Sequence, residues 1–292
     1  MELRADLLVK LSAEVGESPY WDSHSGCLWW VDLLKGELHK ADMTGKDVCV
    51  GIAPGSLGFI VPRVKGQFVA GVNSNVGTLN VNDNGVEFTP MIEAEPYRPG
   101  YRINDGKADS RGRVWFGTMC DDTHKDGKWF CIDEEWNVRP LPQAAQVPNG
   151  LGWTADGRIM YQADSGTRTV SIWEYSDAKG IPTGLKRLVI LPEEYGAPDG
   201  LTVDQEGYAW VACWGGWCVL RISQEGDICG RIHVPAKLVA SCTFGGTGLD
   251  LLLITTATYK LPEKELVEQP LAGSIFVCDP GTAGLEADRS LL

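Results

Sequence analysis

The sequence predicts an all-β protein, a six-bladed β-propeller formed by the single domain 1–292. Three observations lead to this prediction. A short phrase occurs twice, as Val-Pro-Asn-Gly-Leu at 147–151 and as Ala-Pro-Asp-Gly-Leu at 197–201, and the chain continues in a similar way after each copy. Related units of about 45 residues follow one another, each with three or four short strands between Gly, Asp and Asn turns. The 35 glycines, 16 prolines and 11 tryptophans favour short strands and turns over helices.

Taken in order, the chain begins with one strand over residues 5–11, which precedes the repeating units. This strand is placed to complete the last blade, which would close the ring and cover a sheet edge. Each of the twin phrases is expected to form a tight turn with a strand after it, because Pro fixes φ and Gly permits positive φ. The six units span residues 18–41, 58–81, 104–132, 147–175, 197–222 and 240–277.

A radial arrangement explains why these units would occur together. One such sheet cannot bury both of its faces alone, but six sheets arranged around an axis bury one another. Helical periodicity is weak and confined to residues 263–267. A pair of β-sandwiches or a seven-bladed ring fits less well, because the repeat period divides the length into about six.

The charge and residue composition of the chain restrict the kinds of molecule that it is expected to bind and the compartment in which it is expected to lie. A net charge of −13 disfavours nucleic acid and anionic membranes, which need a basic face. Residues 1–6 carry charges and lead into no apolar signal segment, and the longest apolar run, 249–254, is too short to span a bilayer. The nine cysteines form no Cys-x-x-Cys pair, so we expect buried thiols in a reducing cytoplasm, with Cys213 and Cys218 as packing residues. The expected state is a monomer or a weak homo-oligomer.

Several common catalytic signatures are missing, and this narrows the chemistry. The sequence has no Gly-x-Ser-x-Gly elbow, no phosphate-binding glycine loop and no zinc spacing among its four isolated histidines. Residues 80–85 imitate the start of an EF-hand loop, but Met91 stands where a bidentate Glu is required. Asn84 and Gly85 are therefore expected to form a hairpin turn.

Oxygen-bearing side chains stand at the openings of four repeats. Glu17, Asn104, Asn149 and Asp199 occupy these positions in units one, three, four and five. Equivalent positions in a propeller lie at one radius and depth around the channel, so these residues are expected to converge. Two carboxylates and two amide oxygens suit a divalent cation such as Ca²⁺, Mg²⁺ or Mn²⁺. The alternative is that Asn, Asp and Glu occur there because turns favour them.

Five motifs extend this pattern over essentially the whole chain. They are Gly-Glu-Ser-Pro at 16–19, Arg-Ile-Asn-Asp-Gly-Lys at 102–107, Phe-Gly-Thr-Met at 116–119, Pro-Asn-Gly-Leu at 148–151 and Pro-Asp-Gly-Leu at 198–201. Together, in this order and spacing, they resemble the SMP-30/gluconolactonase/luciferin-regenerating family. The resemblance implies a six-bladed propeller, one divalent cation (Ca²⁺, Zn²⁺, Mn²⁺ or Mg²⁺) in the channel and hydrolysis of sugar lactones.

The resemblance also implies roles for individual residues. Glu17, Asn149 and Asp199 would be the metal ligands, Asn104 would lie beside the metal or touch it, and Arg102 would face the substrate. The chain departs from animal members after the Gly-Thr-Met stretch, where Asp122 is a candidate substrate contact. The segment 123–127 is shorter than the loop that covers the site in those relatives.

The chemistry follows from the nature of a lactone, which is a cyclic ester whose hydrolysis passes through an oxyanion. A divalent ion polarises the carbonyl, and a carboxylate at the metal can accept the proton of the attacking water. Asp199 is the candidate base, and Glu17 would hold the ion by its charge. The expected substrate is an aldonolactone of carbohydrate catabolism, such as a glucono-, xylono-, arabinono- or galactonolactone. The alternatives are an esterase or phosphotriesterase on the same site, and a cation-binding regulatory protein without catalysis.

Overall fold

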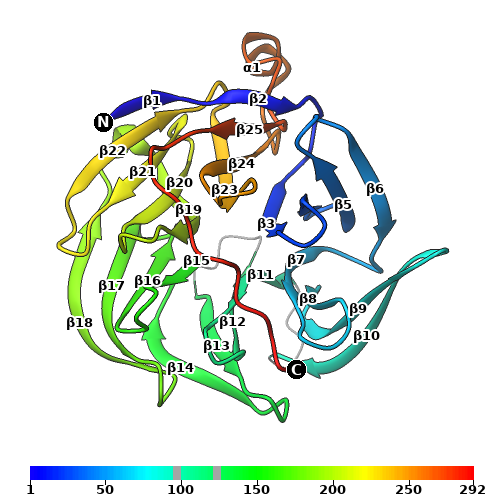
Figure 1. The fold of residues 1–292 in the computed structure, drawn as a ribbon, viewed down its shortest axis with the longest axis vertical. Coiled ribbons are helices and arrows are strands. Elements are labelled where there is room, and N and C mark those ends of the chain that lie inside the picture. The colour runs from blue at the N-terminus through cyan, green and yellow to red at the C-terminus, as the bar shows by residue number, and fades with distance from the viewer. Residues whose placement is uncertain (95–99, 121–125) are drawn as a thin grey trace.

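The computed structural model describes residues 1–94, 100–120 and 126–292 and confirms an all-β propeller. Figure 1 shows the sheets arranged radially around a common centre. Helix in the described ranges is limited to α1 (Glu263–Glu268), where the sequence has its weak helical pattern, and the 3-10 turn η1 (Glu193–Tyr195). Neither is long or apolar enough to cross a membrane.

Four sheets have four antiparallel strands each, and each runs outward from the centre in chain order (Figure 1). The first contains β3 (Gly16–Asp22), β4 (Cys27–Asp32), β5 (Glu37–Asp42) and β6 (Asp47–Ile52). The second contains β7 (Leu57–Pro62), β8 (Phe68–Val72), β9 (Asn75–Asn82) and β10 (Gly85–Glu93). The third contains β11 (Tyr101–Ala108), β12 (Val114–Cys120), β13 (Lys128–Ile132) and β14 (Val138–Ala144). The fourth contains β15 (Pro148–Trp153), β16 (Ile159–Asp164), β17 (Thr169–Ser176) and β18 (Ile181–Ile190).

The remaining nine strands form one hydrogen-bonded sheet, so the described residues form five sheets where the sequence predicts six blades. One residue pair, Trp214 with Leu238, joins β20 to β23 and so merges two groups of strands. β2 pairs antiparallel with β25, which confirms the expected closing strand. The strands are β1 (Glu2–Arg4), β2 (Asp6–Val9), β19 (Ala197–Val203), β20 (Ala209–Trp214), β21 (Cys218–Ile222), β22 (Ile228–His233), β23 (Leu238–Gly245), β24 (Leu251–Ala257) and β25 (Ile275–Cys278).

The twin phrases are the inner strands β15 and β19 themselves, and the prediction that they form tight turns before a strand was wrong. Each contains a β-bulge instead, between Pro148 and Leu151 and between Pro198 and Leu201. A bulge bends a strand locally and re-aims its side chains, which a turn signal in the sequence does not distinguish. Gly150 lies outside the left-handed region; a Cβ there would lie 2.6 Å from the carbonyl oxygen of Asp199, so glycine permits the close approach of β15 and β19.

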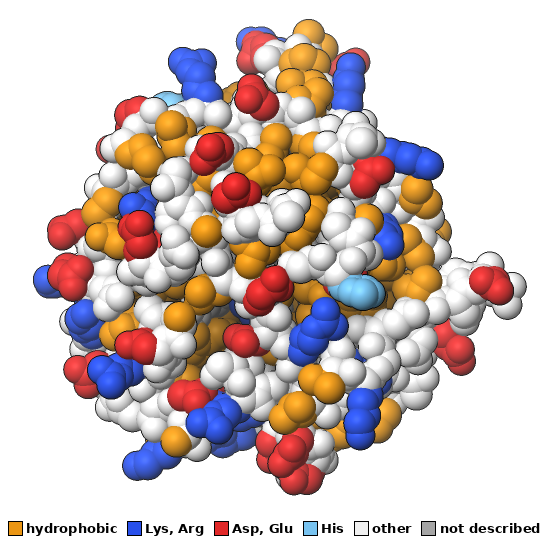
Figure 2. Space-filling view, in the orientation of Figure 1, with side chains coloured by type: hydrophobic (Ala, Val, Ile, Leu, Met, Phe, Trp, Pro, Cys, Tyr) orange, Lys and Arg blue, Asp and Glu red, His pale blue; other side chains and the backbone are white. Residues whose placement is uncertain are grey.

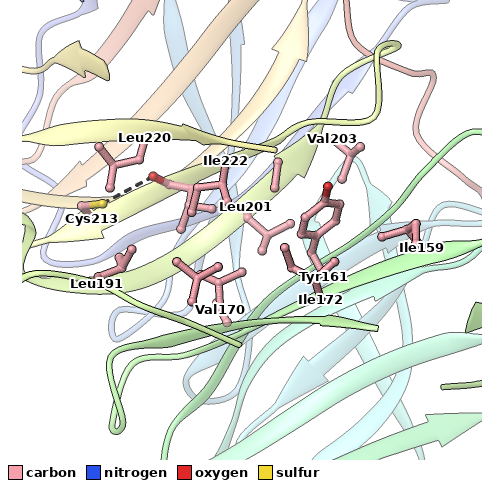
Figure 3. Packing of buried hydrophobic residues seen from close by; sticks show 14 of the residues in the cluster. Ile159, Tyr161, Val170, Ile172, Leu191, Leu201, Val203, Cys213, Leu220 and Ile222 are labelled. Atoms are coloured by element: carbon pink, nitrogen blue, oxygen red, sulfur yellow. Dashed lines mark hydrogen bonds between the residues drawn. The ribbon is translucent and has the colours of Figure 1, made fainter. Parts of the chain in front are cut away.

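Apolar layers between neighbouring sheets hold the ring together. Figure 3 shows the layer between the sheet β15–β18 and the strands β19–β21, where Val170 and Ile172 face Leu201 and Leu220. Each such side chain contributes about 1.5–3 kcal/mol when fully buried. Tyr161 lies in the same layer and donates its hydroxyl hydrogen to Gly207 O at 2.7 Å.

An Asp-x-x-Gly-x-x-Trp pattern stabilises two of the hairpins that follow inner strands. At residues 204–210, Asp204 Oδ1 accepts the backbone N–H groups of Glu206 and Tyr208, and its Oδ2 accepts the Trp210 indole N–H at 2.9 Å. Arg221 donates to the same Oδ2 at 2.7 Å. The copy at residues 109–115 has the same carboxylate-to-indole bond. One buried carboxylate thus serves as the hydrogen-bond acceptor for several backbone and side-chain donors of the hairpin.

The C-terminal segment, residues 279–292, crosses the middle of one face of the ring (Figure 1). Its backbone N–H and carbonyl groups form hydrogen bonds with the ring, Ser290 is fully buried, and Gly284 bridges to Asp204. Figure 2 shows this face, where single acidic and basic side chains are scattered among apolar and uncharged ones. A cavity of about 100 Å³ lies beneath the segment, with Lys107 and Asp288 in its lining.

Replacing Asp204 with Ala should destabilise the protein by about 3–5 kcal/mol. The substitution leaves the buried indole N–H of Trp210 without a hydrogen-bond acceptor and removes a buried partner of Arg221. Urea unfolding followed by tryptophan fluorescence measures this. Glu206→Ala is the matched control, since Glu206 pairs with the same Arg221 at 2.6 Å but is half-exposed. The control should cost at most about 1 kcal/mol. Equal losses in the two variants would contradict the role given to Asp204.

His39 gives the fold a pH dependence. It stacks on Trp30 at 4.1 Å and contacts Asp47 at 2.8 Å and Glu37 at 3.3 Å. Burial acts to lower the pKa of His39, but the hydrogen bonds and charges of Asp47 and Glu37 outweigh it, so the pKa is raised above 6.5. The stabilisation is therefore complete below the unfolded pKa and is lost as the pH rises through the folded one. His39→Gln should lose more stability at about pH 5.5 than at about pH 8.5 in urea unfolding, and a pH-independent loss would contradict this.

Candidate functional site

The structure places the four predicted oxygen donors on inner strands, at or beside the bulges. Glu17 lies on β3, Asn104 on β11, Asn149 on β15 and Asp199 on β19. All four are buried, with exposed fractions between 5% and 7%. The inner strands contact one another around the centre, so residues about 180 positions apart in the chain meet there.

Local backbone features aim these side chains. Ser18 follows Glu17 with a φ of 47°, in the left-handed region, and its N–H donates to Glu17 Oε2 at 3.1 Å. The Ser18 hydroxyl accepts the N–H of Ile60 at 2.9 Å, which ties β3 to β7. Non-glycine residues in this region cost free energy, and such strain is characteristic of functional positions.

Asn104 and Arg102 form one unit beside the bulge of β11. The Asn104 side chain donates to Pro148 O at 2.9 Å, which connects β11 with β15. Arg102 Nη1 donates to Asn104 Oδ1 at 2.7 Å, so the oxygen of this amide already has a partner. Beside Arg102 the surface is hollowed into a groove of about 650 Å³, lined mainly by polar side chains such as Asn73 and Glu93.

The two carboxyl groups lie close enough to disturb each other. Burial raises the pKa of Glu17 well above its usual value, and the charges of Asp199 and Asp105 raise it further. Burial likewise raises the pKa of Asp199, together with the charge of Asp105 and against a hydrogen bond from Asn149. Buried like charges of this kind are relieved by a proton or by a cation.

Asn149 carries the clearest sign of a missing partner. Its Oδ1 is buried and has no hydrogen-bond partner within the described residues. Its Nδ2 donates to Ser165 Oγ at 3.0 Å, and Ser165 donates in turn to Pro198 O at 2.6 Å. The amide is therefore held by its nitrogen, while its oxygen is left for another group.

Sequence reasoning missed Asp105 and Ser165. Asp105 is the residue after Asn104 and accepts the N–H of Gly106 at 2.6 Å, and its charge acts on both Glu17 and Asp199. The sequence offered one signal for Asp105, which is an acidic residue directly after the predicted donor Asn104. Ser165 lies in the loop after β16, and no pattern in the sequence connects it with Asn149. The candidate Asp122 lies outside the described residues.

The donor set fits a hard divalent cation. Within residues 1–94, 100–120 and 126–292, no three His, Cys, Asp or Glu side chains are grouped to hold a metal ion. The candidate donors are instead two carboxylates and an amide, Glu17, Asp199 and Asn149. Oxygen-only sets that include amide oxygens are typical of Ca²⁺ and Mg²⁺ sites. The unpartnered Asn149 oxygen and the repelling carboxyl pair are both features that a cation would satisfy.

Comparison with known proteins places the chain among relatives of this architecture. The SMP-30/Gluconolactonase/LRE-like region matches residues 15–258. The pentonolactonase XacC of Haloferax volcanii is 35% identical over 97% of both chains, and the regucalcin of Bos taurus is 29% identical over 94% of this chain and 93% of its own. A regucalcin structure from Agrobacterium tumefaciens, described as a calcium-binding protein, superimposes with a TM-score of 0.90 at 25% identity, covering 100% of this chain and 99% of its own. The chain belongs to the SMP-30/gluconolactonase/LRE-like family.

Proposed function

We propose that this protein is a metal-dependent lactonase that opens the ring of a sugar-acid lactone, an aldonolactone, to give the aldonic acid. The observation that carries the proposal is the buried carboxyl pair Glu17 and Asp199 beside the unpartnered oxygen of Asn149. The relatives named for lactone hydrolysis support the ester chemistry. A pentono- or hexonolactone is the substrate class we favour.

Glu17, Asn149 and Asp199 would hold the cation, in keeping with the calcium-binding relative. When bound, such an ion supplies charge that stabilises the oxyanion of ester hydrolysis. Asp199 acts as general base and takes the proton of the attacking water.

Arg102 and Asn104 would orient the substrate. Asn104 holds one guanidinium nitrogen of Arg102, which aligns the planar group near the polar groove. A guanidinium in a defined orientation suits paired oxygen acceptors, such as neighbouring hydroxyls of a polyol. Asp122, which lies outside the described residues, remains a proposed substrate contact.

The proposal includes a single domain with six blades. The inner strands β3, β7, β11, β15, β19 and β23 contact one another in sequence and close into a ring. The single residue pair between β20 and β23 supports counting the nine-stranded sheet as two blades.

The regucalcin relatives favour one second candidate, a cation-binding regulator without turnover. Both candidates require the same ligands, so metal binding alone does not separate them. Hydrolysis does, and a panel of aldonolactones, simple esters and phosphotriesters identifies the substrate class.

Asp199→Asn should lower lactone hydrolysis at least about 100-fold, because it removes the proton acceptor. Glu17→Gln should weaken metal binding and lower activity with it. A pH-indicator assay with and without chelator measures activity, and calorimetry measures metal binding. In the metal-free protein both variants should unfold at the same or a higher temperature than the wild type, since each removes one of two repelling buried charges. Full activity after exhaustive chelation would refute metal dependence, and metal binding without hydrolysis of any substrate would favour the regulator.

Ser165→Ala should weaken metal binding about 10-fold, because the Asn149 amide loses the partner that orients it. Activity should recover at saturating metal. Thr167→Ala, two residues away on the same loop, is the control and should leave the metal affinity unchanged. An unchanged affinity in Ser165→Ala would show that the orientation of Asn149 does not depend on this hydroxyl.

A further inference from the structure

A second cavity lies between the third and fourth four-stranded sheets, outside the central site. Its volume is about 220 Å³, and its lining includes Trp129 of β13, Gln143 of β14, Gln162 of β16 and Trp173 of β17. It shares no residue with the central donor set. The volume corresponds to that of about seven water molecules, which is the scale of one small ligand.

Gln162 is unusual for its place in the fold. It pairs with Leu151 after the bulge of β15, as Val211 pairs with Leu201 after the bulge of β19. Val211 belongs to the apolar layer of its blade, whereas Gln162, only 4% exposed, puts an amide at the same position. The propeller therefore does not require an amide here.

Three polar atoms in the lining of this cavity are buried without a hydrogen-bond partner among the described residues. They are Gln143 Oε1, Gln162 Nε2 and the indole Nε1 of Trp173. Buried polar groups are normally paired, and each one left unpaired destabilises the folded state. Two donors and one acceptor without partners thus belong to residues that line this one cavity.

The charge of the lining restricts the ligand. Asp164 is its single charged residue among the described ones, and it is already engaged. Its Oδ2 accepts the N–H of Gln146 at 2.9 Å, and its Oδ1 accepts the N–H of Val147 at 2.8 Å. No Lys or Arg of the described lining is available to an anion. The remaining lining residues carry amides, hydroxyls and the indole rings of Trp129 and Trp173, together with the apolar side chains of Ala144 and Leu188.

We propose that this cavity is a binding site for one neutral, hydroxylated ring of monosaccharide size. Amide groups pair with ring hydroxyls, which both donate and accept, and indole faces pack against the C–H face of a sugar ring. Such pockets combine apolar and aromatic walls with a few placed polar groups. The site is separate from the central one and does not depend on the lactonase proposal.

The test is a titration of the full-length protein with D-xylose, a free sugar without an ester, by calorimetry and saturation-transfer NMR. Saturable binding is expected, and the anion D-gluconate should bind at least tenfold more weakly. Gln162→Val, which introduces the residue type found at the equivalent position of β20, should raise the Kd for D-xylose at least tenfold without lowering the unfolding temperature. Trp173→Phe should raise it severalfold. Gln205→Val, at an exposed glutamine, is the matched control and should leave the Kd unchanged.

The same titration in Asp199→Asn separates the two sites. D-xylose binding is expected to persist there, whatever the outcome of the lactonase assays. Binding that is lost in Asp199→Asn but kept in Gln162→Val would place the sugar in the central channel and overturn the proposal. Absence of saturable D-xylose binding in the wild type would also overturn it, since water would then satisfy the three polar atoms.

Discussion

The close approach of the inner strands around one centre is the constraint on which the rest of the structure depends. Each sheet is apolar on both faces and must be covered by its neighbours, so the sheets turn about an axis and their first strands crowd together. Crowding explains the glycine after Asn149, because a Cβ there would collide with the backbone of β19. It also explains why short side chains from distant parts of the chain can share one small site.

The same crowding makes the centre electrostatically costly. Glu17 and Asp199 are buried with Asp105 nearby, and burial and mutual repulsion raise the pKa of both carboxyls. A structure selected for stability alone would place apolar residues there, as it does in the layers between the blades. The retained charges therefore indicate a function, and the strained backbone at Ser18 points in the same direction.

Much of the fold could be predicted because a repeat leaves its period in the sequence. The strand near residues 5–11 and its place in the last sheet followed from the need to cover an edge, and β2 occupies that place. The bulges could not be predicted, because Pro and Gly mark a turn and a bulged strand alike. The pairing of Trp214 with Leu238, which merges two strand groups into one sheet, depends on tertiary packing and leaves no local signal.

The candidate site could be predicted where position in the repeat determines geometry, as for Asn149 and Asp199. Side chains that act only through a neighbouring residue could not be predicted from the sequence. Ser165 comes from a loop and matters only because the fold places its hydroxyl between Asn149 and Pro198 O. Gln162 was missed for a related reason, since a single glutamine in a strand acquires meaning only when its layer is known to be apolar in the next blade.

The C-terminal segment limits the directions from which a small molecule could approach the four donors. The four donors lie toward the starts of the inner strands, whereas the segment crosses the ring beside the hairpins that follow β3 and β19, at the opposite end. The C-terminal segment therefore lies over the face of the ring opposite to the end at which the inner strands begin. In the proposed lactonase, substrate and product would both approach the donors from the face that the segment leaves uncovered.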